Sequence, residues 1–186
     1  MNLLEEAGYQ VTSIDQSRVM LDIAKDRVKG ELIQMDMREI KLPETYDAVL
    51  CLGSSFTYMQ TDEDVDRALT SFNKVLPKGG VLIFDNFNTE LTDPERHSQW
   101  QESTYEFTDM VIKRRFRNID WSEDHKQWTT EWKYEITQDG TTREMTDYSR
   151  LRAFDQDYLV EKLEENGFEK VKTISKNRLK LLAQKR

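Results

Sequence analysis

Short apolar runs recur along the first half of the chain and predict its strands. They lie at Val11–Ile14, Glu31–Gln34, Tyr46–Leu52 and Val81–Asn86. The third run is apolar on both faces, which is typical of a strand in the middle of a parallel sheet with both sides covered. The pattern therefore favours a sheet that is mostly parallel.

Stretches with helical spacing separate these runs. Residues 3–7 have the pattern of a last helical turn that ends at Gly8, where the absence of a Cβ atom permits a left-handed turn. Apolar residues recur at helical spacing over residues 17–28, with Ser17 suited to the N-cap, and again over residues 62–76. Strands that alternate with helices indicate an α/β fold.

The pattern changes after Asn88, where longer stretches of strand-like sequence begin. These stretches lie at residues 104–118, 127–138 and 141–154, and the QDGT sequence between the last two is a hairpin turn signal. We expect an antiparallel insertion at about residues 100–150, inside a single domain over residues 1–186.

A helix and two strands are predicted for the end of the chain. The helix covers residues 155–166 and stops at Gly167, and the strands cover residues 168–175 and 178–185. So few residues join the two strands that they must run antiparallel. The chain therefore ends in an antiparallel hairpin.

Composition and charge narrow the classes of function. The 35 acidic residues exceed the 27 basic ones and give a net charge of -8, which argues against binding to the phosphate backbone of nucleic acid. A single cysteine, Cys51, lies inside an apolar run and is expected in the core. Because one cysteine cannot form a disulfide within the chain, we expect a reducing, cytoplasmic location. No signal peptide, membrane span of roughly 18 apolar residues or metal-ligand spacing is present in the sequence.

Acidic side chains follow two neighbouring strands. Asp15 ends the first predicted strand, and Asp36 follows the second, 21 positions later. Ligands bind at the carboxyl edge of an open α/β sheet, where one acid suits the hydroxyls of a ribose and the other an adenine amino group. Met20 and Met37 offer soft, polarisable surface to a flat base. The alternatives are that Asp15 caps a helix or is solvated, and that the methionines belong to the core.

The third strand runs into a small, polar loop with the sequence LGSSFTYM. Gly53 lets the backbone approach a ligand closely, and Ser54, Ser55, Thr57 and Tyr58 offer hydroxyl groups. The alternative is a turn whose residues are small for local reasons alone. If the loop binds a ligand, it adds a third component to a nucleotide site at the same edge of the sheet.

Three segments in this order resemble the class I S-adenosylmethionine-dependent methyltransferases. They are GYQVTSIDQSRVMLDIAKDR, IQMDMREIKLPETYDAVLCLGSSFTYM and ALTSFNKVLPKGGVLIFDNFN. The resemblance runs from about Gly8 to Asn88, and the last helix with its hairpin is similar to the end of the family's fold. It implies a Rossmann-like sheet and S-adenosylmethionine as the cofactor.

The resemblance also implies roles for residues on the first two segments. Asp15 matches the family's acid on the ribose, with Gln16 beside it, and Met20 lies where a helix borders the adenine. Asp36 matches the acid that binds the adenine amino group, and Met37 beside it supplies either backbone groups or an apolar wall for the adenine.

The third strand and the insertion complete the implied site. Leu52 and Gly53 match the motif whose backbone faces the methionine end of the cofactor. Similar subfamilies, including sugar-amine and glycine-type N-methyltransferases, often build part of the substrate pocket or an oligomer contact from such an insertion. Tyr58, His97 and Tyr105 are our candidates for lining the pocket of the methyl acceptor.

The sequence departs from the family at its first motif, a strand that leads into a G-x-G loop. The only glycine ahead of Asp15 is Gly8. In the family, that strand lies between those matching Val11–Ile14 and Tyr46–Leu52, and each buried backbone group left unpaired costs on the order of 1–3 kcal/mol. We therefore expect no complete sheet from these residues alone. The sequence is a fragment of a longer chain or begins at an internal Met, or another chain or segment fills the gap, or the sheet rearranges and the cofactor site is lost.

Two further patterns concern the insertion. The KRRFR motif at residues 113–117 would place Lys113, Arg115 and Arg117 on one face of a strand, as a solvated edge guarded by charge. The spacing of three tryptophans suits the inner face of a small sheet, with an aromatic pocket for an amine as the alternative. These are Trp121, Trp128 and Trp132.

The function expected is methyl transfer from S-adenosylmethionine to a small-molecule nucleophile by direct in-line displacement, with an amine favoured over an oxygen. One rival is a non-catalytic or regulatory relative that has lost the first motif. Another is a nicotinamide-dependent dehydrogenase, which also places an acid after its second strand. Exposed inner strands would further favour pairing with a second copy of the chain.

Overall fold

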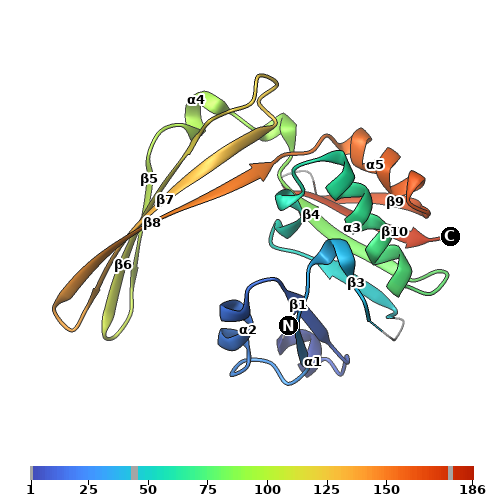
Figure 1. Cartoon of the computed structure of the whole chain (residues 1–186), viewed down its shortest axis with the longest axis horizontal. Helices are drawn as coiled ribbons and strands as arrows, with labels where there is room; N and C mark the ends of the chain where they lie inside the picture. The colour runs from blue at the N-terminus through green and yellow to red at the C-terminus, as the bar shows by residue number, and fades with distance from the viewer. Residues whose placement is uncertain (1, 43–45, 176–177) are drawn as a thin grey trace.

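The computed structural model describes residues 2–42, 46–175 and 178–186, and the chain forms an α/β part and a separate antiparallel sheet (Figure 1). The α/β part contains α1 (Asn2–Glu6), β1 (Thr12–Asp15), α2 (Arg18–Ala24), β2 (Glu31–Gln34), the 3₁₀ helix η1 (Met37–Glu39), β3 (Ala48–Cys51), η2 (Ser55–Tyr58), α3 (Asp62–Val75), β4 (Val81–Asn86), α5 (Gln156–Glu165), β9 (Phe168–Ser175) and β10 (Leu179–Lys185). The insertion contains η3 (Thr89–Leu91), α4 (Pro94–His97), β5 (Gln101–Glu106), β6 (Met110–Ile119), β7 (Gln127–Gln138) and β8 (Thr141–Arg152).

The strands of the α/β part form two sheets. β1 and β2 pair in parallel as one sheet, and the other has the order β3-β4-β10-β9. In the second sheet β3 and β4 are parallel, whereas β10 is antiparallel to both β4 and β9. The expected fold class, mostly parallel with an antiparallel C-terminal hairpin and insertion, is confirmed. So is the expectation of an incomplete sheet, because β1 does not pair with β3.

Contacts outside the sheets join the two pieces of the α/β part. The backbone N–H of Ile40, just after η1, donates to Ser71 Oγ on α3 at 2.7 Å. The backbone N–H of Tyr46 donates to the carbonyl of Val75 at 2.7 Å, and its hydroxyl donates to Thr12 Oγ1 at 3.4 Å. The segment between β2 and β3 therefore fastens the β1–β2 unit to α3.

The main core lies between the second sheet and helices α3 and α5. Phe56 of η2 is fully buried, and its ring lies 5.0 Å from that of Phe84 on β4 and 6.3 Å from that of Phe72 on α3. It also lies 5.7 Å from the ring of Phe154, which follows β8. Aromatic rings at these separations contribute beyond the area they bury. One side chain thus holds a loop, a strand, a helix and the end of the insertion together.

Helix α3 presents a continuous apolar face to this core. Its N-terminus has a capping box, in which Thr61 Oγ1 accepts from the N–H of Asp64 while the Asp64 carboxylate accepts from the N–H of Thr61. The apolar side chains that it buries recur at helical spacing and are Val65, Ala68, Leu69, Phe72 and Val75. The helix begins and covers the sheet as the pattern predicts.

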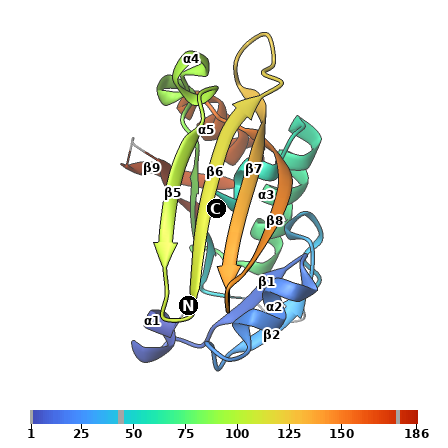
Figure 2. The ribbon, with the colours of Figure 1, turned by 90° about the vertical axis from the view of Figure 1, so that its left-hand side faces the viewer.

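The insertion is a four-stranded antiparallel sheet with the order β5-β6-β7-β8 (Figure 2). The stretch at residues 104–118 was expected as one strand, but it contains the end of β5, a turn at residues 107–109 and most of β6. β6 therefore lies between β5 and β7, so the expectation that Lys113, Arg115 and Arg117 guard a sheet edge is wrong. Periodicity alone missed this turn because the alternation continues through it.

Local signals fixed several other boundaries. The predicted hairpin turn has positive φ at both Asp139 (50°) and Gly140 (72°), as a turn between tightly paired strands requires. Ser17 caps α2 as expected, although this helix ends at Ala24 and not near residue 28. The structure contains no helix, in the parts of the chain that it describes, with the length and apolarity needed to cross a membrane.

Replacement of Phe56 by Ala is expected to destabilise the protein strongly. The substitution leaves a cavity at the meeting point of β4, α3 and the end of the insertion, and such truncations cost about 3–5 kcal/mol. Chemical unfolding of the variant measures the change in the free energy of unfolding. Phe107→Ala is the matched control, because Phe107 is 56% exposed and its removal leaves no cavity. Equal losses in the two variants would contradict this account.

Candidate functional site

The loops after β1, β2 and β3 lie on one side of the α/β part. At one end, Tyr46, which precedes β3, contacts Thr12 at the start of β1. At the other end, Arg38, which follows β2, forms an ion pair at 2.6 Å with Asp64, at the start of α3. The carboxyl ends of both pieces thus form one edge of the molecule, where α/β proteins bind ligands. Asp15, Asp36 and Gly53 all belong to this edge.

Asp15 has an exposed carboxylate at the end of β1. One oxygen accepts a hydrogen bond from the backbone N–H of Ser17 at 2.7 Å, and the other has no partner among the described residues. The backbone carbonyl of Gln16 accepts from the side-chain amide of Gln34 at 2.9 Å, which holds the next residue in place. Met20, on the helix that follows, is 54% exposed. A rigid acid with a free oxygen and an apolar neighbour therefore lies at this strand end.

Asp36 has the same position after β2 but a different environment. It is the N-cap of η1, and the Arg38 side chain donates to both of its carboxylate oxygens at 2.6–3.1 Å. These bonds hold the pKa of Asp36 below its ordinary value, and the same guanidinium lowers the pKa of Asp64. Met37 is half-buried against the main core. Contacts within the protein thus occupy most of the acceptor capacity of Asp36.

The loop after β3 has an unusual backbone. Gly53 and Ser54 have φ values of 80° and 62°, and a Cβ atom on Gly53 would meet nothing within 4 Å, so this glycine serves the left-handed turn and not a close approach within the protein. The backbone N–H of Ser54 donates to Asp85 at 2.5 Å. Leu52 beside it is 45% exposed.

Two buried polar side chains at this edge have no partner among the described residues. They are the hydroxyl of Ser54 and the amide of Asn86 at the end of β4, of which both the nitrogen and the oxygen are unpaired. Buried polar groups without partners are uncommon in proteins, because each costs free energy when it leaves water. Sequence reasoning missed Asn86, because its burial depends on how β4 packs and no motif marks it.

Cys51 precedes this loop and is buried in β3, as expected of a core residue. Burial is the main cause that raises the pKa of its thiol to about 12, and the nearby carboxylate of Asp85 adds to the effect. The thiol is therefore protonated at neutral pH and has little nucleophilic character.

The structure separates the three residues predicted to line the acceptor pocket. Tyr58, at the end of η2, is 51% exposed, and Tyr105, on β5, is 41% exposed. Tyr105 pairs in register with Ile112 on β6, so it lies on the same face of the insertion as Tyr134 on β7. His97 belongs to α4, at the opposite end of β5 from Tyr105 (Figure 2), where its Nδ1 accepts from the N–H of Asp93. The structure does not bring His97 to the two tyrosines.

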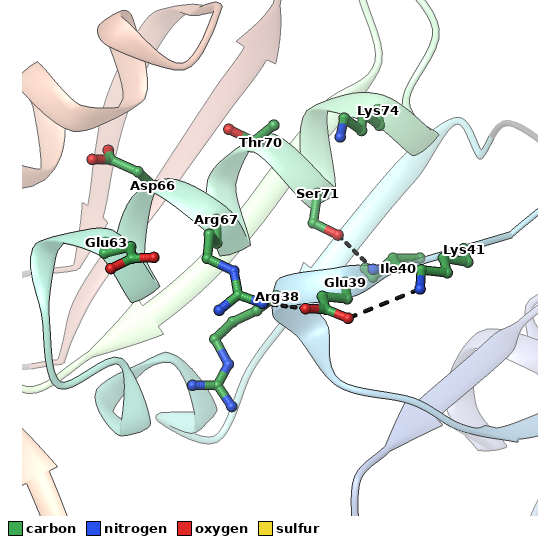
Figure 3. Close-up of a pocket in the computed structure, with 10 residues that line it drawn as sticks. All are labelled: Arg38, Glu39, Ile40, Lys41, Glu63, Asp66, Arg67, Thr70, Ser71 and Lys74. Carbon is green, nitrogen blue, oxygen red and sulfur yellow. Dashed lines mark hydrogen bonds and ion pairs between the residues drawn. The ribbon is translucent and has the colours of Figure 1, made fainter.

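A hollow between η1 and α3 lies on the outer side of the helix (Figure 3). Its lining is mostly charged and consists of Arg38, Glu39, Ile40, Lys41, Glu63, Asp66, Arg67, Thr70, Ser71 and Lys74. Arg67 and Glu39 form an ion pair across it. Because this ion pair and the bond from Ile40 to Ser71 join η1 to α3, the hollow has a structural role.

Residues 1–84 match a family model described as "Methyltransferase domain". This match covers β1 to most of β4, which is the part of the chain that contains Asp15, Asp36 and Gly53. This part of the chain is similar to the methyltransferases. Glycine/sarcosine N-methyltransferase of Aphanothece halophytica is 38% identical over 96 residues, which are 47% of this chain and 36% of that enzyme. The chain therefore matches about a third of the length of this relative.

Two more comparisons extend the likeness. A Streptomyces venezuelae enzyme named dTDP-3-amino-3,4,6-trideoxy-alpha-D-glucopyranose N,N-dimethyltransferase is 34% identical over 73 residues, 39% of this chain and 31% of that enzyme. The solved structure of a SAM-bound amino pentose methyltransferase from Micromonospora echinaspora superposes with a TM-score of 0.79 at 20% identity, over 99% of this chain and 78% of that one. At this identity the superposition shows the fold, and it includes the insertion.

Replacement of Arg38 by Gln is expected to lower the free energy of unfolding by about 1–3 kcal/mol at pH 7, because hydrogen bonds to two carboxylates are lost. The folded-state pKa values of Asp36 and Asp64 are lowered, so this stabilisation is complete above the unfolded value of about 3.9 and is lost as the pH falls through the folded values. Unfolding experiments at pH 7 and below pH 4 measure the difference.

Lys41→Gln serves as the control for Arg38→Gln. Lys41 is 81% exposed and lies 3.9 Å from Glu39, so its removal should change the free energy of unfolding by less than about 0.5 kcal/mol. A difference in the free energy of unfolding between Arg38→Gln and the wild-type protein that grows as the pH falls below 4 would contradict the assignment.

Proposed function

We propose that the chain is part of an S-adenosylmethionine-dependent methyltransferase that methylates a small-molecule amine. The family match over residues 1–84 and the fold support methyl transfer. Relatives named for glycine, sarcosine and an amino sugar support an amine as the acceptor. The lone, buried cysteine favours a reducing location, and the cytoplasm is our proposal.

The free oxygen of Asp15 is the observation that carries this proposal. A ribose presents two neighbouring hydroxyls, which donate best to a carboxylate that is fixed in place and still has open acceptor positions. Asp15 meets this condition, because Ser17 fixes one of its oxygens and the other has no partner among the described residues. Asp36 meets it less well, because Arg38 already donates to both of its oxygens. Asp15 is therefore the primary anchor in this proposal.

Other residues at the edge have supporting roles. The exposed side chain of Met20 offers an apolar wall for the adenine, with Gln16 beside the ribose and Met37 at the base of the site. The turn at Gly53 exposes Leu52 and presents backbone groups toward the amino-acid end of the cofactor. When bound, S-adenosylmethionine supplies a methyl group on a positively charged sulfonium, which is a good leaving group.

The protein's part in the transfer is alignment of the acceptor. In-line displacement needs the amine nitrogen, the methyl carbon and the sulfur on one line, and correct orientation supplies much of the rate. Tyr58 follows the Gly53 loop, and Tyr105 lies on the face of the insertion whose Trp128 packs against the α/β part, so both are suited to orient the acceptor. His97 is not needed for this alignment.

Replacement of Asp15 by Asn is expected to weaken binding of S-adenosylhomocysteine about tenfold or more. The loss of a charged acceptor for the ribose hydroxyls is the reason, since hydrogen bonds to charged groups contribute about 1.5–3 kcal/mol. Isothermal titration calorimetry with the 186-residue protein measures the dissociation constants.

Asp26→Asn is the matched control, because it removes the same charge from an exposed acid in the turn after α2. Unchanged affinity in this control and a loss in Asp15→Asn would support the proposal. Absence of binding to the wild-type protein, or equal affinity in the two variants, would refute it. Fluorescence titration with NADH provides a second check, and saturable binding there would favour a dehydrogenase.

A further inference from the structure

One face of the insertion sheet gathers aromatic side chains around a single arginine. Arg114 on β6 pairs in register with Tyr134 on β7, and the next pair on this face is Phe116 with Trp132. The guanidinium carbon of Arg114 lies 5.3 Å, 5.9 Å and 5.4 Å from the ring centroids of Tyr105, Phe116 and Trp132. We call these five residues the aromatic face. Rings at such distances hold a cation in place by its attraction to their π-electrons.

Arg114 has no anionic partner among the residues that the structure describes. Its Nε atom is buried and makes no hydrogen bond. The neighbouring cations on the opposite face of β6 differ, since Lys113 lies 3.0 Å from Glu135 and Arg117 lies 2.8 Å from Glu131. A guanidinium offers five N–H donors, and leaving a buried donor without an acceptor is costly. The sheet thus supplies acidic partners on one face and leaves the arginine on the other face without one.

The aromatic face is turned toward the edge of the α/β part. Trp128 lies on the same side of β7 as Trp132 and Tyr134, because side chains two positions apart on a strand share a face. Its ring lies 5.6 Å from that of Phe87, which directly follows β4. Tyr105 lies on the same face as Arg114, because it pairs in register with Ile112. The segment that follows η2 contacts the same sheet, since the side-chain amide of Gln60 donates to the carbonyl of Arg150 on β8 at 3.1 Å. Tyr58 ends the 3₁₀ helix that follows Gly53. Arg114 therefore lies on the side of the insertion where a methyl acceptor would meet the cofactor.

We propose that Arg114 binds an anionic group of the methyl acceptor, a carboxylate or a phosphate, and so selects amines that carry one. The proposal rests on the proposed function for the identity of this ligand as a methyl acceptor. A planar guanidinium can donate two parallel hydrogen bonds to a carboxylate or a phosphate. In this proposal the surrounding rings exclude water and hold the guanidinium in place. The acceptor is thereby held at a point remote from its reacting nitrogen.

Two sources of the anion fit this chemistry, and binding experiments separate them. The carboxylate source is represented by sarcosine, with sarcosine amide as its neutral analogue. The phosphate source is represented by dTDP, with thymidine as its neutral analogue. Calorimetry measures each affinity, and the fluorescence of the 186-residue protein provides a second signal because Trp132 lies against Arg114.

At least one of the two anions is expected to bind, and its neutral analogue is not. Arg114→Gln should weaken that binding about tenfold or more, because the charged hydrogen bonds are lost. Arg114→Lys should retain part of it, since the charge stays but the planar fork is lost. The matched control is Arg115→Gln, which removes the same charge from the next residue, an exposed side chain on the other face, and should bind as the wild-type protein does.

The proposal is overturned if neither anion binds, if the neutral analogues bind equally well, or if Arg114→Gln binds as tightly as Arg115→Gln. Thermal unfolding of each variant separates a loss of anion binding from a folding defect. Calorimetry with S-adenosylhomocysteine is run in parallel. If the wild-type protein binds an anion but not S-adenosylhomocysteine, the methyltransferase proposal is contradicted. The anion titrations decide the role of Arg114 in either case.

Discussion

The packing of Phe56 is the interaction on which the rest of the structure depends. Its ring contacts β4, α3 and the segment that returns from the insertion, so three parts of the chain that are distant in sequence meet at one side chain. Because Phe56 belongs to the 3₁₀ helix directly after Gly53 and Ser54, the same contact fixes the loop at the edge of the sheet. The position of the insertion and the shape of the candidate site therefore have a common origin.

The β1–β2 unit depends on a second set of contacts. It shares no sheet with β3, and the contacts that attach it among the described residues include the ion pairs of Arg38 with Asp64 and Arg67 with Glu39, the bond from Ile40 to Ser71 and the contact between Tyr46 and Thr12. These contacts are few and partly exposed, whereas the second sheet has a buried core. Asp15, the proposed anchor of the ribose, lies on the more weakly attached unit. Its position relative to Gly53 thus depends on ion pairs, a few hydrogen bonds and the packing of Met37 and Ile40 against the main core.

Much of the fold follows from local signals in the sequence, and the remainder does not. The apolar runs, the Ser17 cap and the Asp139–Gly140 turn act over a few residues, so they predicted the strands, the start of α2 and the hairpin turn. The split of residues 104–118 into two strands depends on which partner each half meets across the sheet, and alternation is the same on both sides of the turn. The incomplete sheet was predictable because strand pairing is obligatory and the first strand's motif was missing from the sequence.

The candidate site shows the same division between local and distant causes. Asp15 and Asp36 both follow neighbouring strands, so the sequence does not distinguish them as ligand-binding residues. Only the fold brings Asp64 beside Arg38, which then binds both Asp36 and Asp64. Arg38 and Arg114 are likewise both half-buried arginines with unremarkable surroundings in the sequence. The first meets two carboxylates and the second meets three rings and no acid among the described residues. An arginine whose charge is satisfied within the protein stabilises it, whereas one held by rings alone retains its capacity to bind an external anion, and this difference separates the structural from the ligand-binding parts of the molecule.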